Sequence, residues 1–166
     1  YITSFNRPNL HYSVRPKRGG GAVARDVREA LGVLGDDDDA GADGAPRRAA
    51  AIVYCPTVRD CERVAAALDD GGGGVGLYHA GLPLAVRRAA HARFLRGEVW
   101  CVVATVAFGM GIDKPDVRTV VHYGLPKSIE EYYQQTGRAG RDGEPSRCVL
   151  LHAPGDAARM QHGVLR

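Results

Sequence analysis

The stretch VWCVVAT, Val99 to Thr105, decides the fold class of this 166-residue chain. It is apolar almost throughout, whereas a strand with one face in water would alternate apolar and polar residues. A continuous apolar run of this length predicts a strand that is buried on both faces. Such strands are typical of parallel sheets covered by helices on both sides.

Shorter apolar runs of the same kind recur on both sides of this stretch. They are Leu10 to Val14, Ala51 to Cys55, Val75 to His79, Arg118 to Tyr123 and Arg147 to His152. Segments with helical spacing separate them. The alternation predicts a three-layer α/β fold with a central, mostly parallel sheet and helices on both faces.

The helical segments carry start signals as well as spacing. Apolar residues at three- and four-residue intervals predict the first helix, at Val23, Val27, Leu31 and Leu34. Thr57 and Ser128 are each followed three residues later by an acidic residue, which predicts an N-cap at both. Pro83 suits the first turn of a helix that ends near Leu95, and a last helix is expected after Pro154.

The overall composition limits which classes of protein the chain can belong to. A hydrophobic content of 45% and a net charge of +3 fit one globular domain, so a basic binding surface would have to be local. No apolar run is long enough to span a membrane, and the start does not resemble a secretory signal. The four cysteines lack C-x-x-C spacing; they are Cys55, Cys61, Cys101 and Cys148. We expect reduced, structural thiols and an intracellular location.

Residues 35–50 (GDDDDAGADGAPRRAA) are acidic and then rich in glycine and alanine. They offer little apolar surface to bury, so we expect a disordered surface insertion. A metal site at Asp36 to Asp39 is the alternative. Consecutive carboxylates without an enclosing fold are usually solvated, which disfavours that alternative.

Polar residues follow the central strand in the loop ATVAFGMGIDKPDVR. Thr105 offers a hydroxyl where the strand ends, Gly109 and Gly111 allow close backbone approach, and Asp113 offers an acceptor. The loop is either a tight glycine-assisted turn or a contact for phosphate or sugar. Ligands of parallel sheets gather at the carboxyl ends of the strands, which favours the second interpretation.

Two arginines lie in the stretch YYQQTGRAGRDG, Tyr132 to Gly143. Gly137 is expected to end the helix that starts after Ser128, so that Arg138 and Arg141 project from the turn beyond it. The planar donor fork of arginine fits phosphate oxygens. Two alternatives remain: the arginines pair with the nearby acids Asp142 and Glu144, or an R-G tract binds RNA loosely.

These stretches together resemble one family. QQTGRAGRDG is similar to the sixth helicase motif, and VVATVAFGMGIDKPDVR to the fifth. IVYCPT resembles the fourth motif, YHAGL the short motif between fourth and fifth, and SFNRPNL the opening of the domain. Their order and spacing resemble the RecQ family of ATP-dependent DNA helicases over most of Ser4 to Leu151.

The resemblance implies a RecA-like helicase C-terminal domain over residues 1–153. Residues 154–166 would begin a following helical or zinc subdomain, the only expected place for zinc. In this family a first RecA-like domain holds ATP and Mg²⁺ with a G-x-x-x-x-G-K-[ST] loop, which this sequence lacks. We therefore expect an upstream domain of the same chain as partner and no metal ligands here.

The resemblance also implies roles for the nucleotide-facing residues. Arg141 would be the arginine finger that stabilises charge on the transferred phosphoryl group, with Arg138 as a phosphate contact beside it. Gln134 would link the nucleotide state to the neighbouring motif, and Asp113 would contact the ribose or orient the arginine turn. Two glycines would shape the nucleotide site, Gly111 and Gly137.

Single-stranded DNA is the other ligand that the resemblance implies. The phosphate-holding residues would be Thr57, His79, Gly81, Thr105 and Gly109. Contacts of this kind follow the DNA backbone and carry little sequence preference. Movement would be 3′ to 5′, in repair or recombination, in the nucleus of a eukaryote or the cytoplasm of a bacterium. The alternatives are an RNA helicase domain and a non-catalytic nucleic-acid-binding domain.

Overall fold

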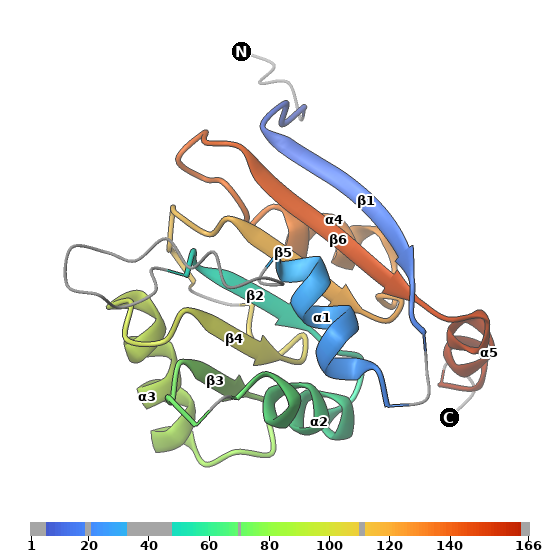
Figure 1. Cartoon of the computed structure of the whole chain (residues 1–166), viewed down its shortest axis with the longest axis horizontal. Coiled ribbons are helices and arrows are strands. Elements are labelled where there is room, and N and C mark those ends of the chain that lie inside the picture. Colours follow the sequence, from blue (N-terminus) through green and yellow to red (C-terminus); the bar gives the residue numbers. More distant parts are fainter. Residues whose placement is uncertain (1–5, 19–20, 33–47, 70, 110–111, 164–166) are drawn as a thin grey trace.

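The computed structural model describes residues 6–18, 21–32, 48–69, 71–109 and 112–163. Within these residues, six strands form one sheet in the order β1-β6-β5-β2-β4-β3, and all neighbouring strands are parallel (Figure 1). The strands are β1 (Leu10–Pro16), β2 (Ala51–Tyr54), β3 (Val75–Tyr78), β4 (Cys101–Ala104), β5 (Thr119–Tyr123) and β6 (Ser146–His152). The predicted α/β fold with a parallel sheet is confirmed.

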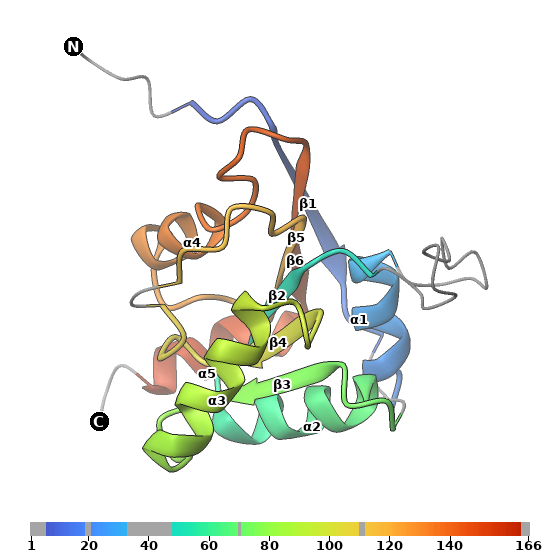
Figure 2. The same ribbon diagram turned by 90° about the vertical axis from the view of Figure 1, so that its left-hand side faces the viewer.

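Helices cover both faces of the sheet. They are α1 (Val23–Leu31), α2 (Val58–Leu68), α3 (Leu84–Leu95), α4 (Ile129–Thr136) and α5 (Pro154–Gly163). One core packs α1 and α2 against the sheet and includes Val103, while Val102 belongs to the core on the other face. Figures 1 and 2 show α1 and α4 on opposite sides of the sheet. Both faces of β4 are therefore buried, which explains its uninterrupted apolar run.

The predicted helix starts are present. The hydroxyl of Thr57 accepts a hydrogen bond from the amide of Asp60 at 3.1 Å, and Ser128 accepts from the amide of Glu131 at 3.1 Å. Pro83 occupies the position just before α3, so that helix begins one residue later than a proline in its first turn would place it. The helix α1 ends at Gly32, whose φ of 75° is left-handed. Leu34 and residues 35–47 lie outside the described residues.

Strand β4 is shorter than its apolar run. It covers Cys101–Ala104, with Val99 and Trp100 before the strand and Thr105 directly after it. Hydrophobicity marks burial, and Val99 is buried without pairing in the sheet. All four cysteines are buried free thiols.

The helix expected after Pro154 is present as α5. The carboxylate of Asp156, in the first turn of α5, forms an ion pair with Lys17 Nζ at 2.7 Å. Both side chains are mostly buried. This ion pair ties the start of α5 to the segment after β1. The division into domains at residue 153 stays a prediction.

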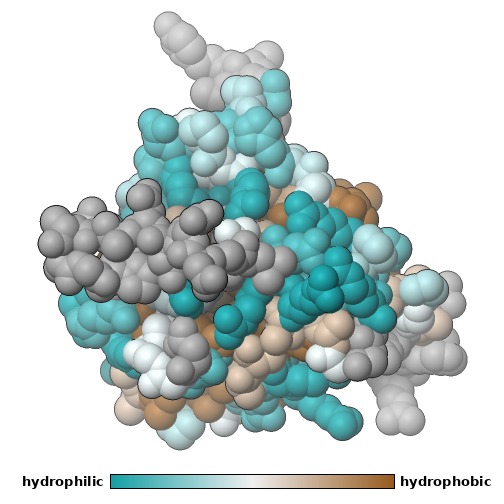
Figure 3. Space-filling view, in the orientation of Figure 1, coloured by the Kyte–Doolittle hydropathy of each residue, from teal (hydrophilic) through white to brown (hydrophobic). Residues whose placement is uncertain are grey.

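The surface seen from the α1 side is mainly hydrophilic, with apolar residues showing in small separate areas (Figure 3). None of the helices in the described part of the chain is long and apolar enough to cross a membrane.

Removal of the Phe94 side chain tests the core on the α3 side of the sheet. Phe94 is completely buried, whereas its neighbour Leu95 is 42% exposed. We expect Phe94→Ala to lower the free energy of unfolding by about 3–5 kcal/mol through lost contacts and a residual cavity. Leu95→Ala, the matched control, should cost less than about 1 kcal/mol. Urea denaturation of the 166-residue chain measures both, and equal losses would contradict this core.

Candidate functional site

The carboxyl ends of three adjacent strands lie close together at one edge of the sheet. The amide of Cys55 donates to the carbonyl oxygen of Ala104 at 2.8 Å, and the amide of Thr105 donates to that of Tyr78 at 3.2 Å. These bonds continue the pairing of β2, β4 and β3 into the loops. Thr57, His79 and Thr105, which follow these strands, therefore form a row along this edge.

Thr57 lies at the exposed start of α2. Its hydroxyl donates to the carboxylate of Asp60 at 2.7 Å while it accepts from the amide of the same residue. Arg63 in turn donates to the Asp60 carboxylate at 3.1 Å. The hydroxyl of Thr57 is thus engaged in capping, and the groups left for an anion are the first backbone amides of α2.

The turn after β3 presents its backbone, because the side chain of His79 points inward and is only 4% exposed. Its Nε2 lies 3.9 Å from a carboxylate oxygen of Glu62, too far for a hydrogen bond. A Cβ atom on Gly81 would lie 3.2 Å from His79 Nδ1. Contacts from this turn to a ligand would therefore come from its exposed backbone, not from the imidazole.

Beyond α4 the chain forms a compact turn, residues 137–144, which we call the arginine turn. Gly137 caps α4 in a right-handed conformation, so the expected helix end is confirmed although the left-handed residue comes later, at Gly140. The amide of Gly140 donates to the carbonyl oxygen of Val117 at 2.8 Å, and that of Asp142 to Pro115 at 3.2 Å. The arginine turn is therefore fixed against the segment that leads into β5.

Both arginines reach from this turn to the loop that follows β4. Arg138 Nη2 donates to the carbonyl oxygen of Gly109. Arg141 Nη1 donates to the carbonyl oxygen of Ile112 at 3.1 Å and lies 3.4 Å from the carboxylate of Asp113. The structure thus brings together residues that the sequence placed in two separate motifs. Gly111 lies outside the described residues.

The Arg141 guanidinium remains accessible. Its side chain is 38% exposed, and that of its ion-pair partner Asp113 is 90% exposed. An ion pair this exposed contributes at most about 1 kcal/mol. A phosphate group could therefore replace the Asp113 carboxylate at little cost.

Asp142 does not pair with these arginines, contrary to the alternative that the sequence left open. Its carboxylate lies 2.6 Å from Arg118 Nη2, and this hydrogen bond lowers the pKa of Asp142. Arg118 also donates to the carbonyl oxygens of Pro115 and Asp116. The Arg118–Asp142 pair thus holds the turn and leaves Arg141 free of this acid.

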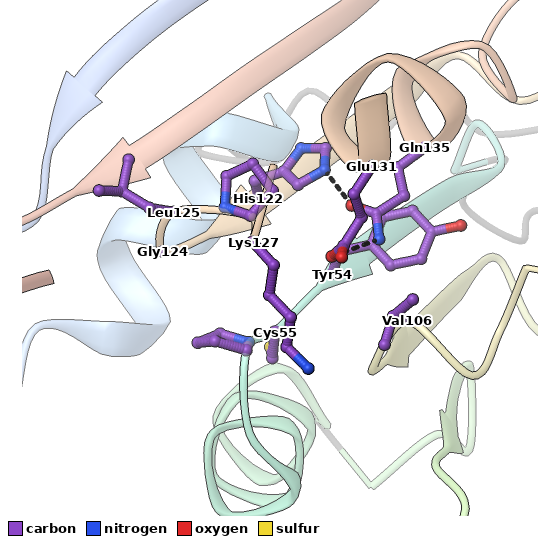
Figure 4. Close-up of a pocket in the computed structure, with 11 residues that line it drawn as sticks. Tyr54, Cys55, Val106, His122, Gly124, Leu125, Lys127, Glu131 and Gln135 are labelled. Carbon is purple, nitrogen blue, oxygen red and sulfur yellow. Dashed lines mark hydrogen bonds between the residues drawn. The ribbon is translucent and has the colours of Figure 1, made fainter. Parts of the chain in front are cut away.

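Sequence reasoning missed a pocket beside this edge. It is lined by Tyr54, Cys55, Pro56, Val106, His122, Gly124, Leu125, Pro126, Lys127, Glu131 and Gln135 (Figure 4). His122 Nε2 lies 2.7 Å from the side-chain amide oxygen of Gln135. The amide nitrogen of Gln135 donates to the carboxylate of Glu131 at 3.2 Å. The second bond orients the amide, so His122 Nε2 must be the donor of the first.

His122 is held neutral in this pocket. Burial lowers the pKa of its imidazole to about 4, although the hydrogen bond to Gln135 acts in the opposite direction. Its ring stacks on Tyr54 with centroids 5.5 Å apart. Tyr54 donates its hydroxyl to the carbonyl oxygen of Phe108 at 2.9 Å, and burial raises the pKa of this phenol to about 12. The floor of the pocket is therefore uncharged and connects β2, α4 and the loop after β4.

Two adjacent glutamines of α4 have different environments in the structure. Gln134, the residue that the sequence predicted to sense the nucleotide, is exposed, and Gln135 is the buried partner of His122. A signal for this arrangement exists in the sequence: histidine is the one polar residue inside the apolar run VVHY. Gln135 also lies four residues after Glu131, the spacing that places both on one helix face.

The comparisons with known proteins agree with this architecture. Residues 45–143 match the family described as helicase conserved C-terminal domain. The chain is 41% identical to ATP-dependent DNA helicase Q-like 2 of Arabidopsis thaliana, a match that covers 96% of the chain and 21% of the relative. It is 46% identical to the bifunctional 3′-5′ exonuclease/ATP-dependent helicase WRN of Mus musculus, a match that covers 93% of this chain and 10% of the relative. The chain spans less than a quarter of either relative.

Solved structures agree with the fold. A DEAD box protein from Methanococcus jannaschii superimposes with a TM-score of 0.70 at 22% identity, covering 93% of this chain and 39% of that one. The C-terminal domain of the DEAD-box protein Dbp5 superimposes with a TM-score of 0.69 at 19% identity. This match covers 96% of this chain and 88% of the other. At such identities the likeness shows the RecA-like fold alone.

A third curated relative is the RecQ-like DNA helicase blm-1 of Caenorhabditis elegans, which is 43% identical over 97% of this chain and 15% of the relative. The match to the family and these identities over nearly the whole chain confirm the resemblance that the motifs indicated. The chain belongs to the helicase conserved C-terminal domain family, in its RecQ-type branch.

Proposed function

We propose that this chain is the second motor domain of an ATP-dependent 3′-5′ DNA helicase, in which it supplies an arginine finger and part of a track for single-stranded DNA. The observation that carries the proposal is the placement of Arg141. Its guanidinium is anchored by the carbonyl oxygen of Ile112, partly exposed, and paired with an acid that is itself exposed. The position in the cell, nucleus or bacterial cytoplasm, stays a prediction.

Arg141 would act on the transition state across a cleft to an upstream motor domain. Its permanent charge and planar fork suit the oxygens of a phosphoryl group in transfer. Arg138 would steady the loop after β4 through the carbonyl of Gly109 and present its remaining donors toward the same ligand. The Nε of Arg138 is buried, so contacts to a ligand would come from the outer nitrogens of its guanidinium.

The guanidinium donors of Arg138 and Arg141 suit the phosphates of ATP. Among the described residues, no cluster of three or more His, Cys, Asp or Glu side chains is placed to hold a metal. We assign the binding of phosphate charge to Arg141 and Arg138. ATP supplies the bond whose cleavage drives the helicase, and Mg²⁺ would be held by the upstream domain.

The DNA track would follow the row of loops after β2, β3 and β4. The backbone amides after Thr57 open the helix α2, where the helix dipole favours an anion. The exposed turn at Gly81 and the half-buried Thr105 continue this row on adjacent strands. Such contacts hold phosphates without reading bases, which suits an enzyme that moves along any sequence.

DNA is favoured over RNA because two of the curated relatives, at 41% and 43% identity, are named DNA helicases. A solved structure with the same fold, domain 2 of Mss116p bound to an RNA duplex, is only 20% identical to this chain. Unwinding of matched DNA and RNA duplexes by the complete helicase decides between the two. Preferential unwinding of RNA would overturn the DNA assignment.

Replacement of Arg141 tests the proposed finger. In the complete helicase, Arg141→Ala should lower kcat for ATP hydrolysis by roughly 10³-fold, the effect of removing an arginine finger. The affinities for ATP and DNA should change much less, because the interaction is strongest when charge develops in the transition state. Arg141→Lys should also be strongly impaired, since a point charge cannot reproduce the planar fork.

Arg96→Ala is the matched control for this variant. Arg96 is an exposed arginine paired with Glu98 at the end of α3, away from the site. It should keep normal turnover, and the melting temperatures of both variants should stay close to that of the parent. Near-normal kcat for Arg141→Ala, or a loss explained by unfolding, would show that Arg141 is not the finger.

The 166-residue chain by itself should fold without hydrolysing ATP. It lacks the G-x-x-x-x-G-K-[ST] loop, and an arginine finger cannot alone hold the triphosphate in line for transfer. Phosphate release by the purified chain should equal the background, with or without single-stranded DNA. Turnover that depends on DNA and persists in an Arg141→Ala version of the chain would point to a different catalytic site.

The isolated chain should bind single-stranded DNA weakly. Its net charge is only +3, and the proposed track consists mostly of backbone groups, so few counterions are released on binding. Fluorescence anisotropy with a labelled oligonucleotide should therefore show a dissociation constant that rises only gently with salt. A steep salt dependence or a strong sequence preference would indicate a binding site other than this row of loops.

A further inference from the structure

Two side chains of the segment before β1 hold the backbone of the arginine turn. Arg7 Nη2 donates to the carbonyl oxygens of Ala139 at 3.0 Å and Gly140 at 2.7 Å. Asn9 Nδ2 donates to the carbonyl oxygens of Gly140 at 2.9 Å and Glu144 at 3.0 Å. We call Arg7 and Asn9 the clasp. It joins parts of the chain that are more than 130 residues apart.

The clasp fits closely against the turn. A Cβ atom on Gly140 would lie 2.5 Å from Asn9 Nδ2 and 2.6 Å from Ser146 Oγ, and the φ of +55° at this residue also favours glycine. Only glycine therefore lets Asn9 approach the Gly140 backbone so closely. The motif's second glycine, Gly140, is explained by this contact with the protein itself.

The clasp is itself fixed in place by backbone hydrogen bonds. The amide of Leu10 donates to the carbonyl oxygen of Arg7 at 3.0 Å, and the amide of Ser146 donates to that of Asn9 at 2.8 Å. The pairing of β1 with β6 begins at the next residues, where Leu10 lies opposite Ser146. Arg7 and Asn9 are thus mounted on the end of the sheet and not on a free tail.

The chemistry of these contacts points to positioning. Ala139 and Gly140 are the two residues between Arg138 and Arg141, so the clasp holds the peptide groups that set the direction of both arginines. All the acceptors are carbonyl oxygens of the arginine turn, at Ala139, Gly140 and Glu144. Asn9 must present its NH₂ group, since its amide oxygen could not bond to a carbonyl.

We propose that Arg7 and Asn9 are positioning residues for Arg141, which hold the arginine turn in the geometry that phosphoryl transfer requires. This inference rests on the proposed function of Arg141. Its physical basis is that a displacement of about 1 Å in a group that acts on a transition state can cost up to about 100-fold in rate. The Arg118–Asp142 pair holds the opposite side of the turn and cannot replace four lost hydrogen bonds.

The sharpest variant is Asn9→Asp in the complete helicase. Aspartate has the shape of asparagine but no donor, so it loses both bonds and faces two carbonyl oxygens with a negative charge. We expect kcat for ATP hydrolysis to fall roughly 10- to 100-fold, with the affinities for ATP and DNA changed about twofold or less. Arg7→Ala should act in the same direction, and Arg7→Lys should recover part of the loss because its ammonium can still donate.

Arg15→Ala is the matched control. Arg15 lies on β1 and donates to the carbonyl oxygen of Glu29 at 3.4 Å, a contact of the same type that is distant in sequence from the arginine turn. Because Arg15 makes one longer bond of this type, its loss should lower the melting temperature no more than Arg7→Ala does and leave kcat unchanged. Equal effects of the two variants on kcat would reduce the clasp to a general stabiliser and overturn the proposal.

Hydrogen exchange separates failure of this inference from failure of the proposed finger. In the complete helicase, peptides covering residues 138–146 should exchange faster in Asn9→Asp and Arg7→Ala than in Arg15→Ala. Unchanged exchange there, or faster exchange with normal kcat, would overturn the clasp as a positioning device. Normal kcat in Arg141→Ala would instead overturn the finger, whatever the exchange at the turn.

Discussion

The contact between the arginine turn and the loop after β4 is the interaction on which the site depends. Arg138 and Arg141 each donate to a backbone carbonyl of that loop, at Gly109 and Ile112. The contact is possible because the long loop after β4 runs back to the amino end of β5, where the turn between α4 and β6 also lies. The amide of Gly140 donates there to the carbonyl oxygen of Val117. Two motifs that are about 30 residues apart in sequence thereby become one structural unit.

Much of this could be predicted from the sequence, for identifiable reasons. Strands buried on both faces leave continuous apolar runs, and helix starts at Thr57 and Ser128 are local signals because the capping residue and its partner amide are three residues apart. The long-range contacts were missed. No pattern of spacing reveals that Asn9 meets Gly140 or that Arg118 pairs with Asp142. Side-chain pairing across the fold depends on the exact placement of elements, which propensity and periodicity do not encode.

The two glutamines show the limit of motif reasoning at single residues. The fixed position in the motif is Gln134, which is exposed, whereas its neighbour Gln135 is buried and bonds to His122. Adjacent residues on a helix point about 100° apart, so one faces a ligand or solvent while the other faces the sheet. Because burial holds the pKa of His122 at about 4, its link to Gln135 stays uncharged across the physiological range of pH. It therefore fixes α4 on the sheet without responding to proton concentration.

The charge distribution explains how a domain of net charge +3 could present the proposed phosphate site. Arg7 and Arg138 direct donors at backbone carbonyls, and Arg118 combines carbonyls with one acid. These cations stiffen the turn from several sides. Arg141 differs, because its acidic partner Asp113 is almost fully exposed and contributes little when water competes. A rigid turn whose outermost arginine has a weak partner can exchange that partner for a phosphate without rearranging, which is the condition for electrostatic stabilisation of a transition state.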